Sequence, residues 1–324
     1  MALLGAFGAL RWHGWLHMEV GDLVMFFFLA NLFFDPVQAI GNQLNQGLMA
    51  MAGAERLFRM LDQESEWQDA ADAKPLLVIK GHVEFQAVHF EYKPGRPVLS
   101  NISFAVEPGQ SVALVGHTGS GKTTLVGLLQ KFYLPANGCV LVDGLDLNKI
   151  TSDSLRSQMG SVQQNNFLFS GSVLDNIQFA RPGATEADVR ATLEALDCLD
   201  LLDALPQRLH TPVTERGASL SFGQRQLVCF ARAMLANPRI VVLDEATSAI
   251  DSVTEARLQK ALDILLHGRT AFIVAHRLST IRKANLVLVL DQGRIVERGT
   301  HESLLHQNGA YARLHHEFVS AQPE

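Results

Sequence analysis

The sequence predicts an α/β fold with a mostly parallel central sheet, preceded by a mostly helical, apolar N-terminal segment. Three observations lead to this prediction. Between residues 78 and 321, short apolar segments typical of strands alternate with longer segments of helical periodicity. A glycine-rich turn joins one of these strands directly to an apolar helix. Residues 23–54 contain a single ionisable side chain, Asp35, a composition typical of a membrane helix.

The N-terminal segment is apolar over a length that suits a membrane helix. Residues 23–34 include five phenylalanines and, with the uncharged residues 37–54, are long enough to span a membrane. We expect one transmembrane helix, kinked near Pro36, that enters from a polar turn at residues 19–22. The alternative is a buried helix of a soluble protein. Residues 1–10 are apolar but lack the basic start and cleavage site of a signal peptide, so we interpret them as the end of an earlier span.

Three parts follow from composition and periodicity. Residues 1–62 are expected to be a partial transmembrane region with a helical extension after Ala54, and the polar, acidic residues 63–77 a linker. Residues 78–321 are expected to form the α/β domain. In it the patterns predict strands at 83–92, 98–106, 111–115, 240–243 and 271–275, a hairpin at 286–297, and helices at 123–132, 186–202, 224–235 and 252–266.

Net charge and cysteine usage exclude some classes of function. The chain of 324 residues has a formal net charge of −6, so we expect no nucleic-acid partner. The three cysteines, Cys139, Cys198 and Cys229, lie far apart without CxxC spacing. They predict small core residues in a reducing compartment rather than disulfides or a zinc site.

A phosphate-binding loop is predicted at residues 116–123, which have the sequence GHTGSGKT. Glycines allow several backbone N–H groups to point at phosphate oxygens, and the helix that follows contributes its positive N-terminus. Lys122 supplies a cation for the β- and γ-phosphates, and the Thr123 hydroxyl is a ligand for Mg²⁺. The alternative is a glycine-rich turn with an incidental lysine. The residues expected to bind the nucleotide here are Gly116, Thr118, Gly119, Ser120, Gly121, Lys122, Thr123 and Thr124.

Two carboxylates, Asp244 and Glu245, end the apolar strand IVVLDE. Ligands of open α/β sheets collect at the carboxyl ends of strands, and adjacent side chains of an extended segment point in different directions. We therefore expect Asp244 to hold Mg²⁺, through water, and Glu245 to act as general base on the attacking water. A solvated acidic turn is the alternative. His276 ends the strand AFIVAH and Gln164 follows a short strand, so both are candidates for contacts with the γ-phosphate, the metal or the water.

A second helix N-terminus is predicted at LSFGQ, residues 220–224. Ser221 and Gln224 have capping-box spacing, and Gly223 permits close approach of a ligand. Because the phosphate-binding loop already supplies one helix N-terminus, this one suits the nucleotide of another copy of the chain. A cap without any ligand is the alternative.

Together these residues resemble the ATPase domain of ABC transporters, over about residues 78–321. GHTGSGKT is similar to the Walker A loop, IVVLDE to Walker B with the catalytic glutamate, LSFGQ to the LSGGQ signature, Gln164 to the Q-loop glutamine and His276 to the switch histidine. Tyr92 matches the aromatic residue that stacks on adenine, SAID with Asp251 is similar to the D-loop, and TERG at residues 214–217 resembles a segment of exporters. The resemblance implies a P-loop NTPase fold with a RecA-like core, an antiparallel β subdomain and a helical signature subdomain.

The resemblance also implies an Mg²⁺- and ATP-dependent ATPase in which two chains enclose two nucleotides. Residues 21–62 look like the last membrane helix and cytoplasmic extension of half-transporters that export drugs, lipids or peptides. It implies a second half-transporter chain, identical or related, an exported substrate of unknown class, and a multi-pass protein of the plasma (inner) membrane with its ATPase domain in the cytoplasm.

Two departures from the family pattern stand out. Phe222 replaces the first signature glycine, although Ser221, Gly223 and Gln224 remain, so we expect activity to survive. An exporter half has six membrane helices, whereas this chain has one and part of another. We therefore interpret it as a C-terminal fragment, or as a protein whose true start lies upstream of Met1. The alternatives are a soluble ATPase of the same superfamily, acting in DNA repair or translation, and a regulatory subunit that binds nucleotide without hydrolysis.

Overall fold

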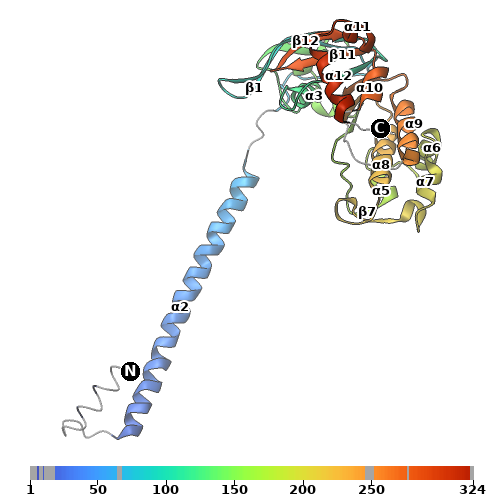
Figure 1. Ribbon diagram of the computed structural model, residues 1–324. Coiled ribbons are helices and arrows are strands. Elements are labelled where there is room, and N and C mark those ends of the chain that lie inside the picture. Colours follow the sequence, from blue (N-terminus) through green and yellow to red (C-terminus); the bar gives the residue numbers. More distant parts are fainter. Residues whose placement is uncertain are drawn as a thin grey trace. The chain divides into compact units, whose positions relative to one another are not determined.

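The computed structural model (Figure 1) describes residues 6, 10, 19–63, 68–244, 252–275 and 277–321. The chain divides into two compact units, Met1–Gln68 and Asp69–Glu324. Three of the predicted site residues, Glu245, Asp251 and His276, lie outside the described residues.

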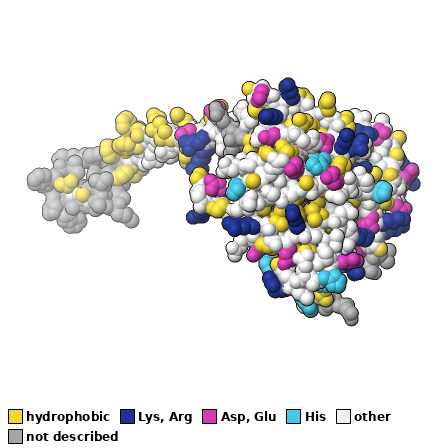
Figure 2. All heavy atoms as spheres, turned by 90° about the horizontal axis from the view of Figure 1, so that it is seen from above, with side chains coloured by type: hydrophobic (Ala, Val, Ile, Leu, Met, Phe, Trp, Pro, Cys, Tyr) yellow, Lys and Arg dark blue, Asp and Glu magenta, His cyan; other side chains and the backbone are white. Residues whose placement is uncertain are grey.

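Most of the described part of the first unit is one continuous helix, α2 (Val20–Leu61), which is 42 residues long and includes Pro36. The polar turn expected at its entrance belongs to the helix itself, because the backbone N–H of Glu19 donates to Asp22 Oδ2 at 3.0 Å. The segment Val24–Leu61 is long and apolar enough to cross a membrane. Its large apolar side chains are exposed, and Figure 2 shows them in yellow along the helix. Within the described chain, this helix is therefore not the buried core helix that was the alternative.

The second unit contains a six-stranded sheet in the order β12-β11-β3-β10-β9-β6. All neighbouring strands are parallel except the edge pair β11 and β12, so the predicted, mostly parallel sheet is confirmed. Successive residues of β3 alternate between two cores: Val112 and Leu114 belong to one, Ala113 and Val115 to the other. The strands are β3 (Ser111–Val115), β6 (Met159–Val162), β9 (Ile240–Asp244), β10 (Thr270–Val274), β11 (Leu286–Asp291) and β12 (Arg294–Gly299).

A four-stranded antiparallel sheet covers one of these two cores, in the order β2-β1-β4-β5. Phe85 and Phe104 pair across β1 and β2, and their rings stack with centroids 4.7 Å apart. Helix α3 packs into the same core through its buried leucines. The elements are β1 (Val83–Lys93), β2 (Arg96–Val106), α3 (Lys122–Leu129), β4 (Asn137–Val142) and β5 (Leu145–Asp146).

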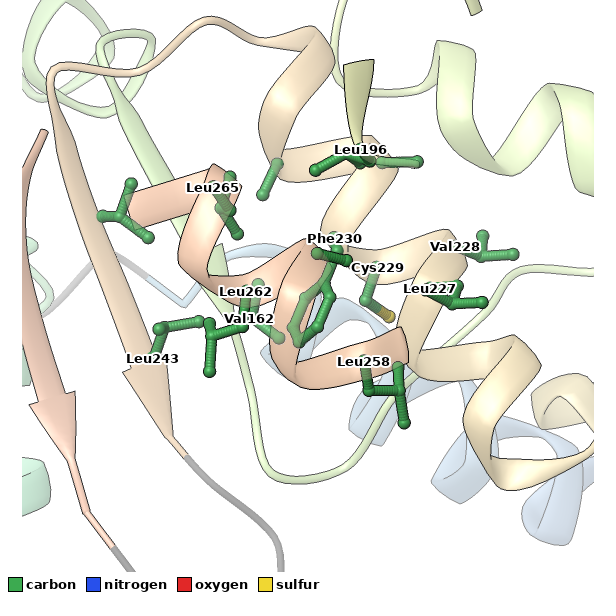
Figure 3. Close-up of a cluster of buried hydrophobic side chains, with 14 of the residues drawn as sticks. Val162, Leu196, Leu227, Val228, Cys229, Phe230, Leu243, Leu258, Leu262 and Leu265 are labelled. Atoms are coloured by element: carbon green, nitrogen blue, oxygen red, sulfur yellow. The ribbon is translucent and has the colours of Figure 1, made fainter. Parts of the chain in front are cut away.

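The other core is covered by helices, and α5 to α9 gather on one side of this unit (Figure 1). Figure 3 shows Phe230 of α8 lying among Leu258 and Leu262 of α9 and side chains of β6 and β9. The helices are α5 (Val173–Gln178), α6 (Glu186–Ala195), α7 (Leu199–Asp203), α8 (Phe222–Leu235) and α9 (Ser252–Leu266).

The single helix predicted at residues 186–202 is wrong, because two helices, α6 and α7, occupy this stretch. Asp197 between them has a φ of +55°, in the left-handed region, which a continuous right-handed helix does not contain. Helix α3 also ends at Leu129 rather than at Phe132, and Lys131 just beyond it has a φ of +54°.

Short elements complete the unit. Strands β7 and β8 form a two-stranded antiparallel ribbon. The remaining elements are η1 (Leu147–Lys149), α4 (Ser152–Arg156), β7 (Gly171–Ser172), η2 (Arg208–His210), β8 (Pro212–Val213), η3 (Glu215–Gly217), α10 (Leu278–Lys283), α11 (His301–His306) and α12 (Ala310–Ala321).

The three cysteines are free, and Cys198 and Cys229 are buried in the helical core. The prediction of three core residues is wrong for Cys139, which is only partly buried on β4. Burial raises the pKa of the Cys198 thiol to about 12 and that of Cys229 to about 11. Both thiols therefore stay protonated and behave as small apolar residues.

Candidate nucleotide-binding site

The predicted phosphate-binding loop joins β3 to α3 and depends on backbone conformations that favour glycine. Gly116 has a φ of +151°, and a Cβ there would collide with the carbonyl oxygen of Leu290. Gly121 has a φ of +103°, and a Cβ there would lie 2.6 Å from Leu99 Cδ2. The loop therefore curls against the end of the sheet in a way that residues with side chains would prevent.

Lys122, the first residue of α3, is buried with 7% of its surface exposed. Its Nζ donates to the carbonyl oxygens of Gly116 at 2.7 Å and His117 at 2.9 Å. Burial lowers the pKa of Lys122, while the nearby Asp244 carboxylate raises it. The ammonium thus lies inside the loop where water is partly excluded, so the attraction of an anion to it is weakly screened.

An open cleft of about 500 Å³ lies beside this loop. It brings together five separate parts of the sequence, and its size is that of a site for a small ligand. It is lined by Tyr92, Val98, Thr118, Gly119, Gly121, Lys122, Thr123, Thr124, Gln164, Asp244 and Val274. Ser120 is buried behind the loop, where its Oγ lies 3.4 Å from Lys122 Nζ, and Thr124 is buried in α3.

Three oxygen-bearing side chains in this cleft fit a magnesium ion. Thr123 offers a hydroxyl near the start of α3, Asp244 a carboxylate at the end of β9, and Gln164 an amide oxygen just after β6. Mg²⁺ prefers hard oxygen ligands and usually shares them with substrate phosphates. Among the described residues no cluster of three His, Cys, Asp or Glu side chains forms a complete metal cage. A site of this kind would draw its other ligands from phosphate and water.

Tyr92 forms one wall of the cleft and is about half exposed. Its hydroxyl lies 3.0 Å from Thr124 Oγ1, and its ring packs edge-on against Phe90 and Tyr133 at centroid distances of 4.9 and 5.1 Å. The aromatic support holds the ring in place, and its exposed surface suits the stacking of a nucleotide base.

Helix α8 begins directly after Ser221, and the predicted capping box is confirmed. Ser221 Oγ accepts from the Gln224 N–H at 3.2 Å, and Gln224 Oε1 accepts from the Ser221 N–H at 2.9 Å. Phe222 is half-buried, with the Arg225 guanidinium 5.9 Å from its ring centre. Among the described residues that line the cleft, none belongs to LSFGQ.

Gly223 has a packing role that the sequence did not reveal. It is buried, and a Cβ there would lie 2.6 Å from Thr254 Cγ2 on α9. The absence of a side chain therefore lets α8 pack closely against α9. This role does not depend on whether a ligand also approaches Gly223.

Three lining or supporting residues, Val98, Val274 and Tyr133, were not expected from the sequence. Val98 and Val274 are ordinary apolar strand residues, and Tyr133 follows α3 outside any motif. Val274 could have been found in part, because it lies near the end of the strand predicted at 271–275, and the carboxyl ends of parallel strands meet at one edge of the sheet.

The chain is similar to proteins of known family. A family model described as ABC transporter matches residues 99–248. The chain is 44% identical over 92% of its length to an uncharacterized ABC transporter ATP-binding protein, YknV, from Bacillus subtilis, of which it covers 49%. It is 42% identical over 91% of its length to a β-(1→2)glucan export ATP-binding/permease protein, NdvA, from Rhodopseudomonas palustris, again covering 49%.

A solved structure, a bacterial Atm1-family ABC exporter with ATP bound, aligns with 98% of this chain at 38% identity and a TM-score of 0.76; the match covers 56% of that chain. The chain thus spans about half the length of the relatives it matches. The predicted P-loop NTPase fold class is confirmed, with its parallel core sheet, antiparallel sheet and helical part. Residues 99–248 thus form an ABC transporter domain, and over nine-tenths of its length the chain is similar to ATP-binding proteins of ABC transporters.

Proposed function

We propose that the chain is the ATP-binding and ATP-hydrolysing part of an ABC exporter half-transporter. The observation that carries this proposal is the cleft in which Tyr92, the phosphate-binding loop, Gln164 and Asp244 meet. An aromatic wall for a base, a buried lysine for phosphates and oxygen ligands for a metal are what a nucleoside triphosphate with Mg²⁺ requires.

The chain's own residues divide the work of phosphoryl transfer. Lys122 and the backbone N–H groups of the loop bind and orient the β- and γ-phosphates. Thr123, Asp244 and Gln164 would hold Mg²⁺, which would supply positive charge to neutralise the negative charge that develops on the phosphates. Glu245 would take the proton of the attacking water as general base, and His276 would hydrogen-bond the γ-phosphate and keep water and base in line. Asp251 would contact the nucleotide from the D-loop.

The site would be completed by a second chain. Ser221, Gly223 and Gln224 lie outside the lining of the cleft formed by their own chain. We infer that they contact the nucleotide bound to an identical or related half-transporter, in a head-to-tail pair that closes on ATP and opens after hydrolysis. The relatives with ATP-binding and permease parts support such an arrangement.

The membrane part is proposed from the exposed apolar helix α2. Its length exceeds the roughly 20 residues that a bilayer requires. We propose that residues 1–62 belong to a transmembrane domain, residues 63–77 connect it, and residues 78–321 form the ABC domain, on the cytoplasmic side of the plasma (inner) membrane in a multi-pass protein. The exposed apolar side chains of α2 argue against a soluble ATPase of DNA repair or translation. The presence of every catalytic motif in the sequence argues against a regulatory subunit.

The test is ATP hydrolysis by the purified full chain over a range of protein concentrations, with Glu245→Gln as the matched variant. We expect a rate per chain that rises with concentration, because two chains share each site. Glu245→Gln should abolish turnover while ATP binding is retained, because the amide fills the same space but cannot act as a base. Undiminished hydrolysis by Glu245→Gln would remove Glu245 from that role, and a rate per chain independent of concentration would contradict the shared site.

A further inference from the structure

Residues 69–79, here named the strap, are fixed to the second unit although their composition predicts a linker. Asp69 begins this unit, and the strap runs alongside residues 149–158, which include α4. Backbone bonds join the two segments at 2.9 Å from Lys74 N–H to Lys149 O and at 3.0 Å from Thr151 N–H to Lys74 O. Further bonds join Leu76 N–H to Ser154 Oγ at 2.8 Å, Ile79 N–H to Gln158 Oε1 at 2.9 Å and Gln158 Nε2 to Leu77 O at 3.0 Å.

The strap begins at an ion pair between Asp69, whose side chain is partly exposed, and a buried lysine, Lys131. The Lys131 side chain is 1% exposed, and its Nζ donates to Asp69 Oδ1 at 2.7 Å and to the carbonyl oxygen of Ile150. A lysine buried to this degree is costly unless its charge is paired and its hydrogen bonds are satisfied. Lys131 lies outside the lining of the nucleotide cleft, so phosphate binding does not account for its burial.

Asp69 holds two elements at once. Besides the bond from Lys131, it accepts from the Ser152 N–H at 2.8 Å and from Ser152 Oγ at 2.6 Å. Burial alone would raise the pKa of Asp69, but the hydrogen bonds from Lys131 and Ser152 outweigh it and lower the pKa to about 2. The carboxylate is therefore charged at any physiological pH.

These two elements carry residues of the nucleotide site. Lys131 follows the C-terminus of α3, whose first residue is Lys122, and Ser152 starts α4, which leads through β6 to Gln164. The ends of α3 and α4 are also joined directly, because Arg156 donates to the carbonyl oxygens of Gln130 at 3.1 Å and Lys131 at 2.7 Å. Helix α3 has eight residues, about 12 Å, so a shift of its C-terminus is passed rigidly to the phosphate-binding loop.

We propose that Asp69 is a positioning residue for the nucleotide site: through Lys131 and Ser152 it fixes the phosphate-binding helix relative to the strand that precedes Gln164. The same carboxylate anchors the segment that arrives from α2, so the chain from the apolar helix is fastened at this point of the ATP-binding domain. This inference rests on the proposed ATPase function and deepens it. It makes the relative placement of Lys122 and Gln164 depend on a side chain outside the cleft.

The experiment compares ATP hydrolysis by the full wild-type chain, Asp69→Asn and a matched control, Asp203→Asn. Asp203 pairs with Arg190 at 2.8 Å, and its side chain is 27% exposed against 30% for Asp69, but it lies on α7 away from the cleft lining. We expect Asp69→Asn to lower kcat about tenfold with the KM for ATP changed less than about twofold, because misplaced catalytic groups slow the reaction more than they weaken binding. Asp69→Glu, which keeps the charge, should restore part of the rate, and Asp203→Asn should leave kcat unchanged.

Unchanged kcat in folded Asp69→Asn, or an equal loss in Asp203→Asn, would overturn the proposal. Hydrogen exchange of the wild-type chain with and without ATP, with divalent metal chelated to prevent hydrolysis, tests it without any variant. We expect ATP to slow exchange of the amides of Lys74, Leu76 and Ile79 together with those of the phosphate-binding loop. Slower exchange at the loop alone would overturn it. If the wild-type chain binds ATP without hydrolysing it, the proposed ATPase function is contradicted instead. The hydrogen-exchange result would then test the positioning role of Asp69 by itself.

Discussion

Helices α3 and α8 begin in opposite ways, although both N-termini are expected to face nucleotide phosphates. The first residue before α3 is Gly121, in a left-handed conformation, and no side chain caps this helix. The first residue before α8 is Ser221, which forms a reciprocal capping box with Gln224. The first N–H groups of a helix need partners. No side chain supplies one at α3, whereas at α8 the Ser221 hydroxyl satisfies the N–H of Gln224 within its own chain.

This difference indicates which helix end depends on the nucleotide. At α3 the loop, a buried lysine and the cleft are assembled around a place for an anion. At α8 the serine hydroxyl already accepts one hydrogen bond, but its O–H remains a donor that a phosphate oxygen can accept. The nucleotide would thus be bound chiefly by α3 of one chain and only completed by α8 of another, and the two ends should respond differently to substitution.

The largest expected effect is at α3, with Lys122→Met. Methionine keeps the apolar stem and removes a charge whose pKa is lowered by burial, so the chain without nucleotide should lose no thermal stability. ATP affinity should fall about a hundredfold or more, since the phosphates lose a weakly screened cation. Isothermal titration with ATP and thermal unfolding without it measure the two effects. Retained affinity, or a clear loss of stability without nucleotide, would mean that Lys122 is a structural residue of the loop.

The next effect is at α8, where Ser221→Asp separates capping from ligand contact. Aspartate is as good a cap as serine, so helix stability should be kept, but its negative charge would face a phosphate. We expect hydrolysis to fall about tenfold or more at a protein concentration where two chains associate, with ATP affinity of the single chain nearly unchanged. Ser221→Ala is the companion variant, which should lose about 1 kcal/mol of stability as well as activity. Full activity of folded Ser221→Asp would show that Ser221 only caps the helix.

The sequence predicted the starts of both helices from local motifs, but it did not predict every residue that lines the cleft. The phosphate-binding loop and IVVLDE are local strand–turn–helix signals, so the loop, Asp244 and most strands of the parallel sheet were found from contiguous residues. Val98 and Val274 line the cleft because of how their strands pair in two different sheets, and only for Val274 did the predicted strand give part of the signal. The break at Asp197 depends on one left-handed residue, which a helical periodicity spanning 186–202 conceals.

The predicted linker, residues 63–77, is a second case in which contacts with distant residues are not visible in the local sequence. Its polar composition predicts a linker, but the hydrogen-bond partners of Asp69, Lys74 and Leu76 lie 62 to 83 residues further along the chain. A polar side chain stays in solvent only where the protein provides no hydrogen-bonding partner. A partner far away in the sequence is not visible in a short sequence window.

The smallest effect concerns Gly223. Its two roles, in ligand approach and in helix packing, predict different outcomes when Thr254→Ser is added to Gly223→Ala. In Gly223→Ala the new Cβ would lie 2.6 Å from Thr254 Cγ2. The resulting strain of about 1–3 kcal/mol is partly offset by the roughly 1 kcal/mol that alanine gains over glycine in a helix. We expect a net loss of about 1 kcal/mol in the free energy of unfolding. Thr254→Ser removes Cγ2 and keeps the hydroxyl, so the double variant should recover this loss, measured by denaturant unfolding in a double-mutant cycle.

Hydrolysis by the double variant then decides between the two roles. If Gly223 serves only the packing of α8 on α9, the rate returns together with stability. If a nucleotide of a second chain must approach the backbone at Gly223, the double variant is as stable as Thr254→Ser but remains slow. The second outcome is the one that a completed two-chain site requires, because the nucleotide of the other chain must then approach the backbone at the start of α8 where no side chain is present.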